Sequence, residues 1–462
     1  MKLNLIPFLL LSITTLFAQA TNKETNNWQN LFNKKDLSNW EQKNGTAQYK
    51  IEGDEIVGIS RLKIGNSFLC TKKKYSNFIL EIEVKIHPLL NSGIQIRSDS
   101  KADYRKGAVH GYQVEIDPSK RAYTGGIYDE SRRGWIYPLS DNEDGRNAFK
   151  QSQWNKLHIE AIGSEIRVWL NGVNTANIYD ERTAEGFIAL QVHSIGNETH
   201  LEGKEVRWRN VRIKTSDLES DRWEMSPAVY ENNFVPNVLT DNELRNGWRL
   251  LWDGKTTTGW RSVKSNTFPK KGWVIKDGEL TVMKNDGAES AHGGDIITTE
   301  KYSNFELRLD FKITKGANSG VKYMVDTHLN KGEGSAIGLE CQLLDDNMHP
   351  DAKKGLNGNR TIGALYDLIP PENLSRPGHN KDFKGIGNWN QLRIKSLNGK
   401  IEHWLNGYKI VEYDRYTQVF RTLVAHSKYR VWEQFGQLAS GYILLQDHGD
   451  EVSFRSIKIK AL

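Results

Sequence analysis

Residues 441–460 of the chain read GYILLQDHGDEVSFRSIKIK, and residues 186–214 hold a related stretch, GFIALQVHSIGNETHLEGKEVRWRNVRIK. Apolar and polar residues alternate in VSFRSIKIK and in VRWRNVRIK. A period of two residues is typical of a β-strand that buries one face. Both stretches also place a Gln and a His next to a run of apolar residues. This repeated exception indicates that the two residues have a purpose beyond packing.

The similarity between the two halves of the chain extends well beyond these stretches. KYSNFILEIEVKIHPLLNSGIQIRS (74–98) aligns with KYSNFELRLDFKITKGANSGVKYMV (301–325), and WNKLHIEAIGSEIRVWLNGV (154–173) aligns with WNQLRIKSLNGKIEHWLNGY (389–408). A period above 200 residues is too long for a solenoid repeat and indicates a duplicated domain. We therefore expect two domains, 28–214 and 246–462, joined by a linker over 215–245.

The alternation within each copy predicts the fold class. Turn signals such as Asn171-Gly172 and Asn406-Gly407 separate the strand-like runs, and helical periodicity is scarce. The chain is therefore predicted to be all-β, with two tandem β-sandwich domains of the jelly-roll type, each built from two antiparallel sheets.

Composition narrows the classes of partner. The 462 residues carry a net charge of +6 that is spread along the chain, with no Lys/Arg block longer than that in TKKKY (71–75). A nucleic-acid-binding protein concentrates its positive charge, so no nucleic-acid partner is expected. The two cysteines, Cys70 and Cys341, lie in different halves of the chain, which excludes a disulfide framework.

The first twenty residues, MKLNLIPFLLLSITTLFAQA, differ from the rest of the chain. A basic start, a short apolar run and Ala-Gln-Ala predict a secretory signal peptide over 1–20 that is cleaved after Ala20. The apolar run is too short to span a bilayer comfortably. We expect a periplasmic or extracellular protein without membrane insertion.

Strand alternation also sorts the polar side chains by sheet face. In each copy the Gln and His of the opening stretch share one face, opposite the apolar residues. GYQVEID (111–117) and GLECQLL (338–344) occupy equivalent places, but Glu and Gln are swapped between them. The residues expected on the polar faces are Gln191, His193, Gln113, Glu115, Asp117 and Arg97 in the first copy, and Gln446, His448, Glu340, Gln342 and Lys322 in the second.

Two interpretations of these polar faces differ in consequence. A solvated outer sheet face would explain any one of the residues. Matched amide, carboxylate and imidazole groups in two diverged copies instead indicate two sites, because Glu and His suit acid/base catalysis or metal binding. We predict as catalytic Glu340, His448, Glu115 and His193, and as substrate-binding Gln342, Gln446, Gln113, Gln191, Arg97, Asp117 and Lys322.

Further candidates lie in loops. Three carboxylates follow matched tyrosines and are added to the substrate-binding set: Asp367, Asp129 and Glu130. His349 lies beside Asp residues in DDNMHPD and joins Glu340 and His448 as a candidate metal ligand. The chain has no His-x-x-x-His or Cys-x-x-Cys pair, so no cofactor is assigned, and any divalent metal ion would be held by residues distant in sequence.

Taken together, the blocks resemble the 3-keto-disaccharide hydrolase domain family. LLWDGKTTTGW (250–260), YSNFELRLDFK (302–312) and IEHWLNG (401–407) follow the family pattern in the second copy, and GYQVEIDPSKRAYTGGIYDESRRGWIYP (111–138) is similar to another branch. The resemblance covers nearly all of both copies. It implies a concanavalin-like β-sandwich and cleavage of 3-keto-glucosides or 3-keto-disaccharides.

The implied substrate has a clear chemical logic. A ketone at carbon 3 makes the hydrogen on carbon 2 acidic, so a base can remove it and the glycosidic oxygen leaves by elimination. Addition of water then completes a net hydrolysis. Such a site needs a base, a proton donor and a group that stabilises the enediolate, but not the paired carboxylates of ordinary glycosidases.

Two alternatives stay open from the sequence. In the first, the chain is a non-catalytic carbohydrate-binding protein, since fold alone does not fix function. In the second, one catalytic copy is joined to a copy that only binds carbohydrate. The Glu/Gln swap, and the lack of a DDNMHPD counterpart in the first copy, argue against identical activities. We expect elimination and hydration to be divided between the copies.

Overall fold

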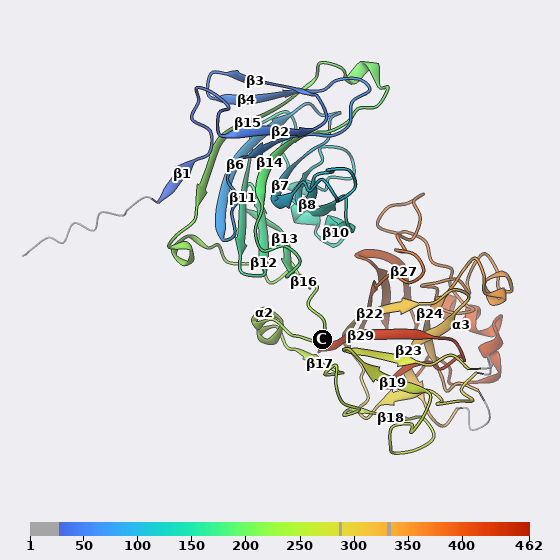
Figure 1. The fold of residues 1–462 in the computed structure, drawn as a ribbon. Helices are drawn as coiled ribbons and strands as arrows, with labels where there is room; N and C mark the ends of the chain where they lie inside the picture. The colour runs from blue at the N-terminus through green and yellow to red at the C-terminus, as the bar shows by residue number, and fades with distance from the viewer. Residues whose placement is uncertain (1–26, 286–288, 330–333) are drawn as a thin grey trace, which may run out of the picture.

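The computed structural model describes residues 27–285, 289–329 and 334–462 and forms two β-sandwich domains in tandem, as predicted (Figure 1). The predicted signal peptide lies outside the described residues. Helices are short: α1 (Glu143–Asn147), α2 (Asp241–Arg245) and α3 (Gln418–Ala425). None of the helices formed by the described residues has the length and apolar character that crossing a bilayer would require.

The first domain stacks a nine-stranded sheet on a seven-stranded sheet. The larger sheet has the order β16-β13-β12-β11-β6-β15-β4-β3, with β1 beside β15. Its strands are β1 (Trp28–Asn30), β3 (Gln48–Glu52), β4 (Glu55–Ile59), β6 (Phe78–Ile86), β11 (Asn155–Ile162), β12 (Glu165–Leu170), β13 (Val173–Tyr179), β15 (Glu205–Lys214) and β16 (Glu231–Asn233). The smaller sheet, β10-β9-β8-β7-β14-β5-β2, contains β2 (Trp40–Asn44), β5 (Ser67–Thr71), β7 (Ser92–Asp99), β8 (His110–Ile116), β9 (Ile127–Glu130), β10 (Gly134–Tyr137) and β14 (Phe187–Val192).

The second domain repeats this topology. Its larger sheet has the order β19-β20-β29-β22-β25-β26-β27, with β17 beside β29, and its smaller sheet has the order β18-β21-β28-β23-β24. The larger sheet contains β17 (Trp248–Leu250), β19 (Trp273–Lys276), β20 (Glu279–Val282), β22 (Phe305–Ile313), β25 (Asn390–Leu397), β26 (Lys400–Leu405), β27 (Tyr408–Asp414) and β29 (Val452–Ala461). The smaller sheet contains β18 (Trp260–Ser262), β21 (Ile296–Thr298), β23 (Asn318–Asp326), β24 (Ile337–Leu344) and β28 (Tyr442–Leu445).

Alternation fills each core from the two facing sheets. Tyr112, Val114 and Ile116 of β8 are buried in the first core, and the equivalent face of β24 contributes Leu339 and Cys341 to the second. Each large apolar side chain stabilises the fold by about 1.5–3 kcal/mol when it is fully buried. The opposite face of each smaller sheet carries the polar residues of interest, and we call it the site face.

Arg97 departs from this alternation and corrects the sequence-based expectation. A β-bulge interrupts β7 after Ile96, and Arg97 adopts a φ of 44°. The bulge removes its side chain from the site face. Arg97 is buried instead and donates to Ser76 O and Gly163 O, each at 2.7 Å. It therefore fixes loops of the sandwich and has no direct access to a substrate on the site face.

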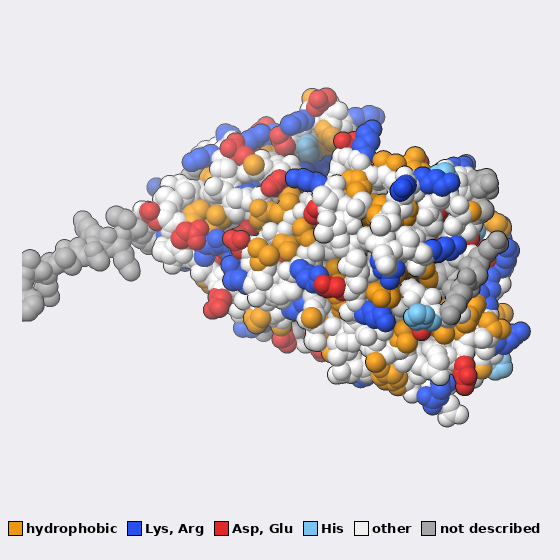
Figure 2. Space-filling view, turned by 90° about the horizontal axis from the view of Figure 1, so that it is seen from below, with side chains coloured by type: hydrophobic (Ala, Val, Ile, Leu, Met, Phe, Trp, Pro, Cys, Tyr) orange, Lys and Arg blue, Asp and Glu red, His pale blue; other side chains and the backbone are white. Residues whose placement is uncertain are grey.

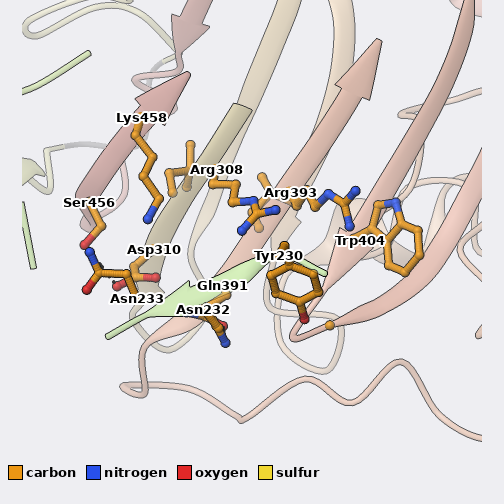
Figure 3. A pocket seen from close by; sticks show the side chains of 13 residues that line it. Tyr230, Asn232, Asn233, Arg308, Asp310, Gln391, Arg393, Trp404, Ser456 and Lys458 are labelled. Carbon is orange, nitrogen blue, oxygen red and sulfur yellow. Dashed lines mark hydrogen bonds between the residues drawn. The ribbon is translucent and has the colours of Figure 1, made fainter. Parts of the chain in front are cut away.

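Residues 215–245, expected to be a linker, contain more regular structure than the sequence predicted. They supply β16, which pairs in parallel with β13, and α2, whose Thr240 and Glu243 form a capping box. The segment packs on the outer face of the larger sheet of the second domain (Figure 3). There Asn232 and Gln391 exchange two hydrogen bonds at 3.0 Å, and the Arg308 guanidinium lies 4.7 Å from the ring centroid of Tyr230.

Charge on the surface is interspersed. In the view of Figure 2, basic and acidic side chains alternate with apolar ones over both domains. Both cysteines are buried and free, as the absence of a disulfide framework predicted.

The ion pair between Lys458 and Glu243 generates a stability prediction. Both side chains are buried, and Glu243 also accepts a hydrogen bond from Asn233 at 2.9 Å. Glu243→Ala leaves the buried ammonium group without this partner, so the free energy of unfolding should fall by about 3 kcal/mol. Denaturant unfolding of the full chain measures this, with exposed Asp241→Ala as the control. Equal losses in the two variants would contradict the role given to Glu243.

Candidate functional site

The site face of the first domain is organised in rows that run across three strands. Strand pairing aligns Gln191 of β14, Gly93 of β7 and Glu115 of β8 in one row. The next row holds Gln95 beside Gln113. A side chain on Gly93 would collide with Gln113, so this glycine provides the space that the polar residues occupy.

Glu115 is held by a set of amide donors. Asn91 Nδ2 donates to Oε1 at 2.7 Å, and Gln113 Nε2 donates to Oε2 at 3.0 Å. An Arg121 Nη2 atom lies 3.6 Å from the carboxylate. Glu115 is only 4% exposed, and burial raises its pKa to about 7 despite these favourable contacts. A carboxyl group with this pKa exchanges protons readily at neutral pH.

The Gln and His of the opening stretch differ in environment. Gln191 is fully buried, and neither its amide oxygen nor its nitrogen has a hydrogen-bond partner among the described residues. Such groups are costly unless water or a ligand bonds to them. His193 is exposed, but surrounding protein lowers its pKa by desolvation, and its Nδ1 atom lies 2.7 Å from Ser194 O.

The second domain repeats the rows with the carboxylate moved. Gln446 directly follows β28 and donates its backbone N–H to Gly320 O of β23 at 3.0 Å, and Gly320 pairs with Gln342 of β24 to complete the first row. Lys322 lies beside Glu340 in the next row. The Lys322 ammonium is 3.5 Å from Glu340 Oε2. When the amide of Gln342 is oriented with its nitrogen toward acceptors, it donates to Glu340 Oε1 at 3.3 Å.

Glu340 shares its surroundings with a lysine that the sequence did not single out. Burial raises the pKa of Glu340, and burial lowers the pKa of Lys428. The Lys428 ammonium lies 4.3 Å from the ring centroid of Tyr366. The charges of Lys428 and Glu340 interact, and each shifts the pKa of the other group. Two buried titratable groups of opposite charge therefore interact, with their pKa values displaced toward neutrality.

A second cluster lies at the end of β28. His349, His448 and Asp450 offer ligand atoms that all lie within 4.8 Å of one another, while Glu340, expected among the ligands, is not in this group. Two imidazoles and a carboxylate form a donor set that suits a divalent transition metal or zinc. Asp450 has an apolar counterpart in the first copy, Ile195.

Three of the carboxylates predicted to bind substrate have partners within the protein. Asp117 accepts from Arg121 Nε at 2.6 Å, and Asp367 accepts from Arg360 Nε at 2.8 Å. Asp367 also accepts from the Lys428 backbone N–H at 2.9 Å, so it positions the segment that carries Lys428. Glu130 is partly buried and accepts a hydrogen bond from the Ser131 hydroxyl at 3.4 Å.

The structure corrects the prediction that Asp129 binds substrate. It pairs in register with Tyr112, whose side chain faces the core, so Asp129 shares the core face and Tyr128 takes the site face opposite Gln113. Asp129 is fully buried and binds Arg132 at 2.6 Å and Arg133 at 2.5 Å. The adjacent turn residues, rather than a substrate, satisfy this carboxylate.

The structure also adds residues that the sequence analysis missed. Asn91 and Arg121 contact Glu115, and Asn318 occupies the place of Asn91 in the second copy. The repeated Asn-Ser-Gly of both halves was a usable signal for the asparagines. Lys428 and Asp450 have no counterpart of the same type in the other copy, so the repeat could not reveal them.

These observations define the class of protein: a tandem β-sandwich with one buried polar site on the smaller sheet of each domain. The model of the 3-keto-alpha-glucoside-1,2-lyase-like domain matches residues 27–214 and 247–460. The chain belongs to this carbohydrate-active family, and the resemblance inferred from its sequence is confirmed.

Individual relatives match about half of the chain. A 3-keto-disaccharide hydrolase of Bacteroides thetaiotaomicron is 34% identical over 238 residues, which are 47% of this chain and 79% of the relative. Two crystal structures described as glycosyl hydrolases of Parabacteroides distasonis ATCC 8503 are 31% and 29% identical. They cover 49% and 47% of this chain and 100% of their own, with TM-scores of 0.43 and 0.34.

The raised pKa of Glu115 generates a pH prediction. Between pH 4.5 and 7 the folded protein holds a proton on Glu115 that the unfolded chain releases, so this group makes folding less favourable as pH rises. Glu115→Gln removes that effect. The free energy of unfolding of the variant, relative to the wild type, should therefore increase by about 3 kcal/mol between pH 4.5 and pH 8.

Denaturant unfolding at several pH values tests this, with exposed Glu41→Gln as the matched control. A difference between Glu115→Gln and the wild type that does not change with pH would show that Glu115 has an ordinary pKa.

Proposed function

We propose that this chain cleaves 3-keto-glycosides by elimination across carbons 1 and 2, followed by hydration, and that the two steps are divided between its domains. One observation carries the proposal: each domain buries a carboxyl group of raised pKa on its site face, but in rows two residues apart. The family membership and the name of the Bacteroides relative support the substrate class.

We assign elimination to the second domain. Glu340 removes the proton from carbon 2, and the electron pair of that C–H bond forms the carbon 1–carbon 2 double bond as the glycosidic C–O bond breaks. Lys428 protonates the departing oxygen, and its lowered pKa makes it the better donor. Lys322 offers positive charge beside Glu340 for the developing enediolate.

The cluster of His349, His448 and Asp450 supports the same assignment. A divalent cation held there would polarise the ketone or its neighbouring hydroxyl. Independently of any ion, the imidazole of His448 and the amide of Gln446 offer hydrogen-bonding groups to sugar oxygens. Gln446 Nε2 donates to Glu289 at 2.9 Å, whereas its Oε1 is buried and has no partner among the described residues.

We assign hydration to the first domain. Glu115 accepts a proton from water as the oxygen bonds to carbon 1, and the protonated carboxyl then returns a proton to carbon 2. A pKa of about 7 suits a group that must act in both directions. Gln191, whose amide has no partner among the described residues, offers bonds to sugar hydroxyls, and His193 lies at the exposed end of the same strand face.

The function test follows both steps in one NMR time course with a 3-keto-glucoside and the full chain. Glu340→Gln and His448→Ala should each slow cleavage by about 100-fold or more, the scale for losing a group that acts on the substrate. Glu115→Gln should still cleave but accumulate the unsaturated keto-sugar. Glu83→Gln, on the larger sheet of the first domain, is the control and should behave as the wild type.

Each competing account has its own outcome. Wild-type cleavage by Glu340→Gln would remove Glu340 from the mechanism. Complete hydrolysis by Glu115→Gln, without an intermediate, would overturn the division of steps. Binding of the glycoside by the wild type without turnover would favour a non-catalytic carbohydrate-binding protein.

A further inference from the structure

A cavity of about 800 Å³ is lined by residues of both domains, and neither Glu115 nor Glu340 is among them. The first domain lines it with residues 132, 133, 135, 136 and 180–182, and residues 234–236, which follow β16, also line it. The second domain contributes residues from the outer face of its larger sheet and from the loop before β25. Ligand pockets commonly have this volume and commonly form where domains meet.

Positive charge predominates in the wall of this cavity. Five basic side chains line it against three carboxylates: Arg132, Arg133, Arg182, Lys384 and Arg455 against Asp180, Glu181 and Asp310. Asp180 pairs with Arg133, and Asp310 pairs with Arg455 at 3.1 Å. Lys384 and Arg182 form no ion pair with any carboxylate of the described residues.

The Lys384 side chain of the second domain contacts the first domain and has one N–H donor without a partner among the described residues. Its ammonium donates to Arg133 O at 3.0 Å and to Trp135 O at 3.2 Å, both in the first domain. An ammonium group has three N–H donors, so one is left for a ligand. Burial lowers the pKa of Lys384 and outweighs the opposing effect of the Asp382 carboxylate, and the nearby positive charge of Arg133 lowers it further. A bound anion would relieve both effects.

Arg132 adds a second unused donor. Its Nε atom binds Asp129 at 2.6 Å, and its Nη1 atom donates to Thr183 at 2.6 Å. The side chain is only 7% exposed, yet its Nη2 atom is buried without a hydrogen-bond partner among the described residues. A buried donor of this kind is unfavourable until an acceptor arrives.

We propose that the interdomain cavity is a binding site for an acidic saccharide, whose carboxylate lies among Lys384, Arg182 and Arg132. Charge-assisted hydrogen bonds from these groups would fix the carboxylate. The sugar class follows from the carbohydrate-active family, and the amide of Asn388 in the same wall offers a bonding group for a hydroxyl. The site is separate from Glu115 and Glu340 and does not depend on the proposed reaction.

The two domains contribute to the site together. Arg132 and Arg182 belong to the first domain, whereas Lys384 belongs to the second, so the ligand would bridge them. A ligand that binds the folded, assembled pair raises its apparent stability. Binding and thermal unfolding are therefore two readouts of one event, and neither requires turnover.

Calorimetric titration of the full chain with glucuronate tests the proposal, with glucose and acetate as the neutral-sugar and simple-anion probes. Glucuronate should bind, raise the unfolding temperature and weaken with added salt. Glucose and acetate should each bind at least 10-fold more weakly. Lys384→Ala and Arg182→Ala should each weaken glucuronate binding by about 10-fold or more, the scale of one charge-assisted bond.

The Arg182→Ala variant is expected to fold normally, because Arg182 is exposed and its side chain forms no ion pair among the described residues. A loss of binding in this variant therefore reports on the cavity. Arg105→Ala, on the surface outside the cavity, is the matched control and should bind as the wild type does. Acetate binding as tightly as glucuronate would overturn the saccharide assignment. Glucuronate binding that survives both cavity variants, or no binding by the wild type, would overturn the site.

Discussion

A β-strand can move a side chain along one sheet face only in steps of two residues, about 6–7 Å, and this constraint governs both sites. Glu115 and Glu340 lie on equivalent strands and on the same face, one step apart. Any intermediate shift would point the carboxyl group into the core. Under the proposed function, the two domains would present their carboxyl groups to different atoms of a bound sugar without altering the sandwich around them.

Burial changes the acid–base properties of the two displaced glutamates. Gly93 and Gly320 leave room for polar side chains that would otherwise collide with a neighbouring strand. Glu115 and Glu340 are themselves nearly inaccessible to solvent, so desolvation raises the pKa of both glutamates. The fold gives up stability for this, since a carboxylate is costly to bury, and the rest of each sandwich supplies the apolar packing that offsets it.

Much of the fold, and part of the candidate site, follows from the sequence. Alternation and the internal repeat predicted the two sandwiches and the faces of residues such as Glu115 and Gln342. The prediction for Arg97 was wrong because a β-bulge reverses the alternation locally. The prediction for Asp129 was wrong because the register of its strand cannot be read from the sequence. Lys428 lies far from Glu340 in the sequence, so only tertiary packing brings the two together, and Asp450 has an apolar counterpart in the first copy, so the repeat does not single it out.

The central claim is that the carbon 2–hydrogen bond breaks during cleavage, and deuterium incorporation tests it most directly. The full chain is allowed to cleave a 3-keto-glucoside in D₂O, and the released keto-sugar is analysed by NMR at early times, with enzyme-free product in D₂O as the exchange control. The account predicts one deuterium at carbon 2 in each product molecule. Product that keeps its original hydrogen at carbon 2 would contradict elimination and require direct hydrolysis.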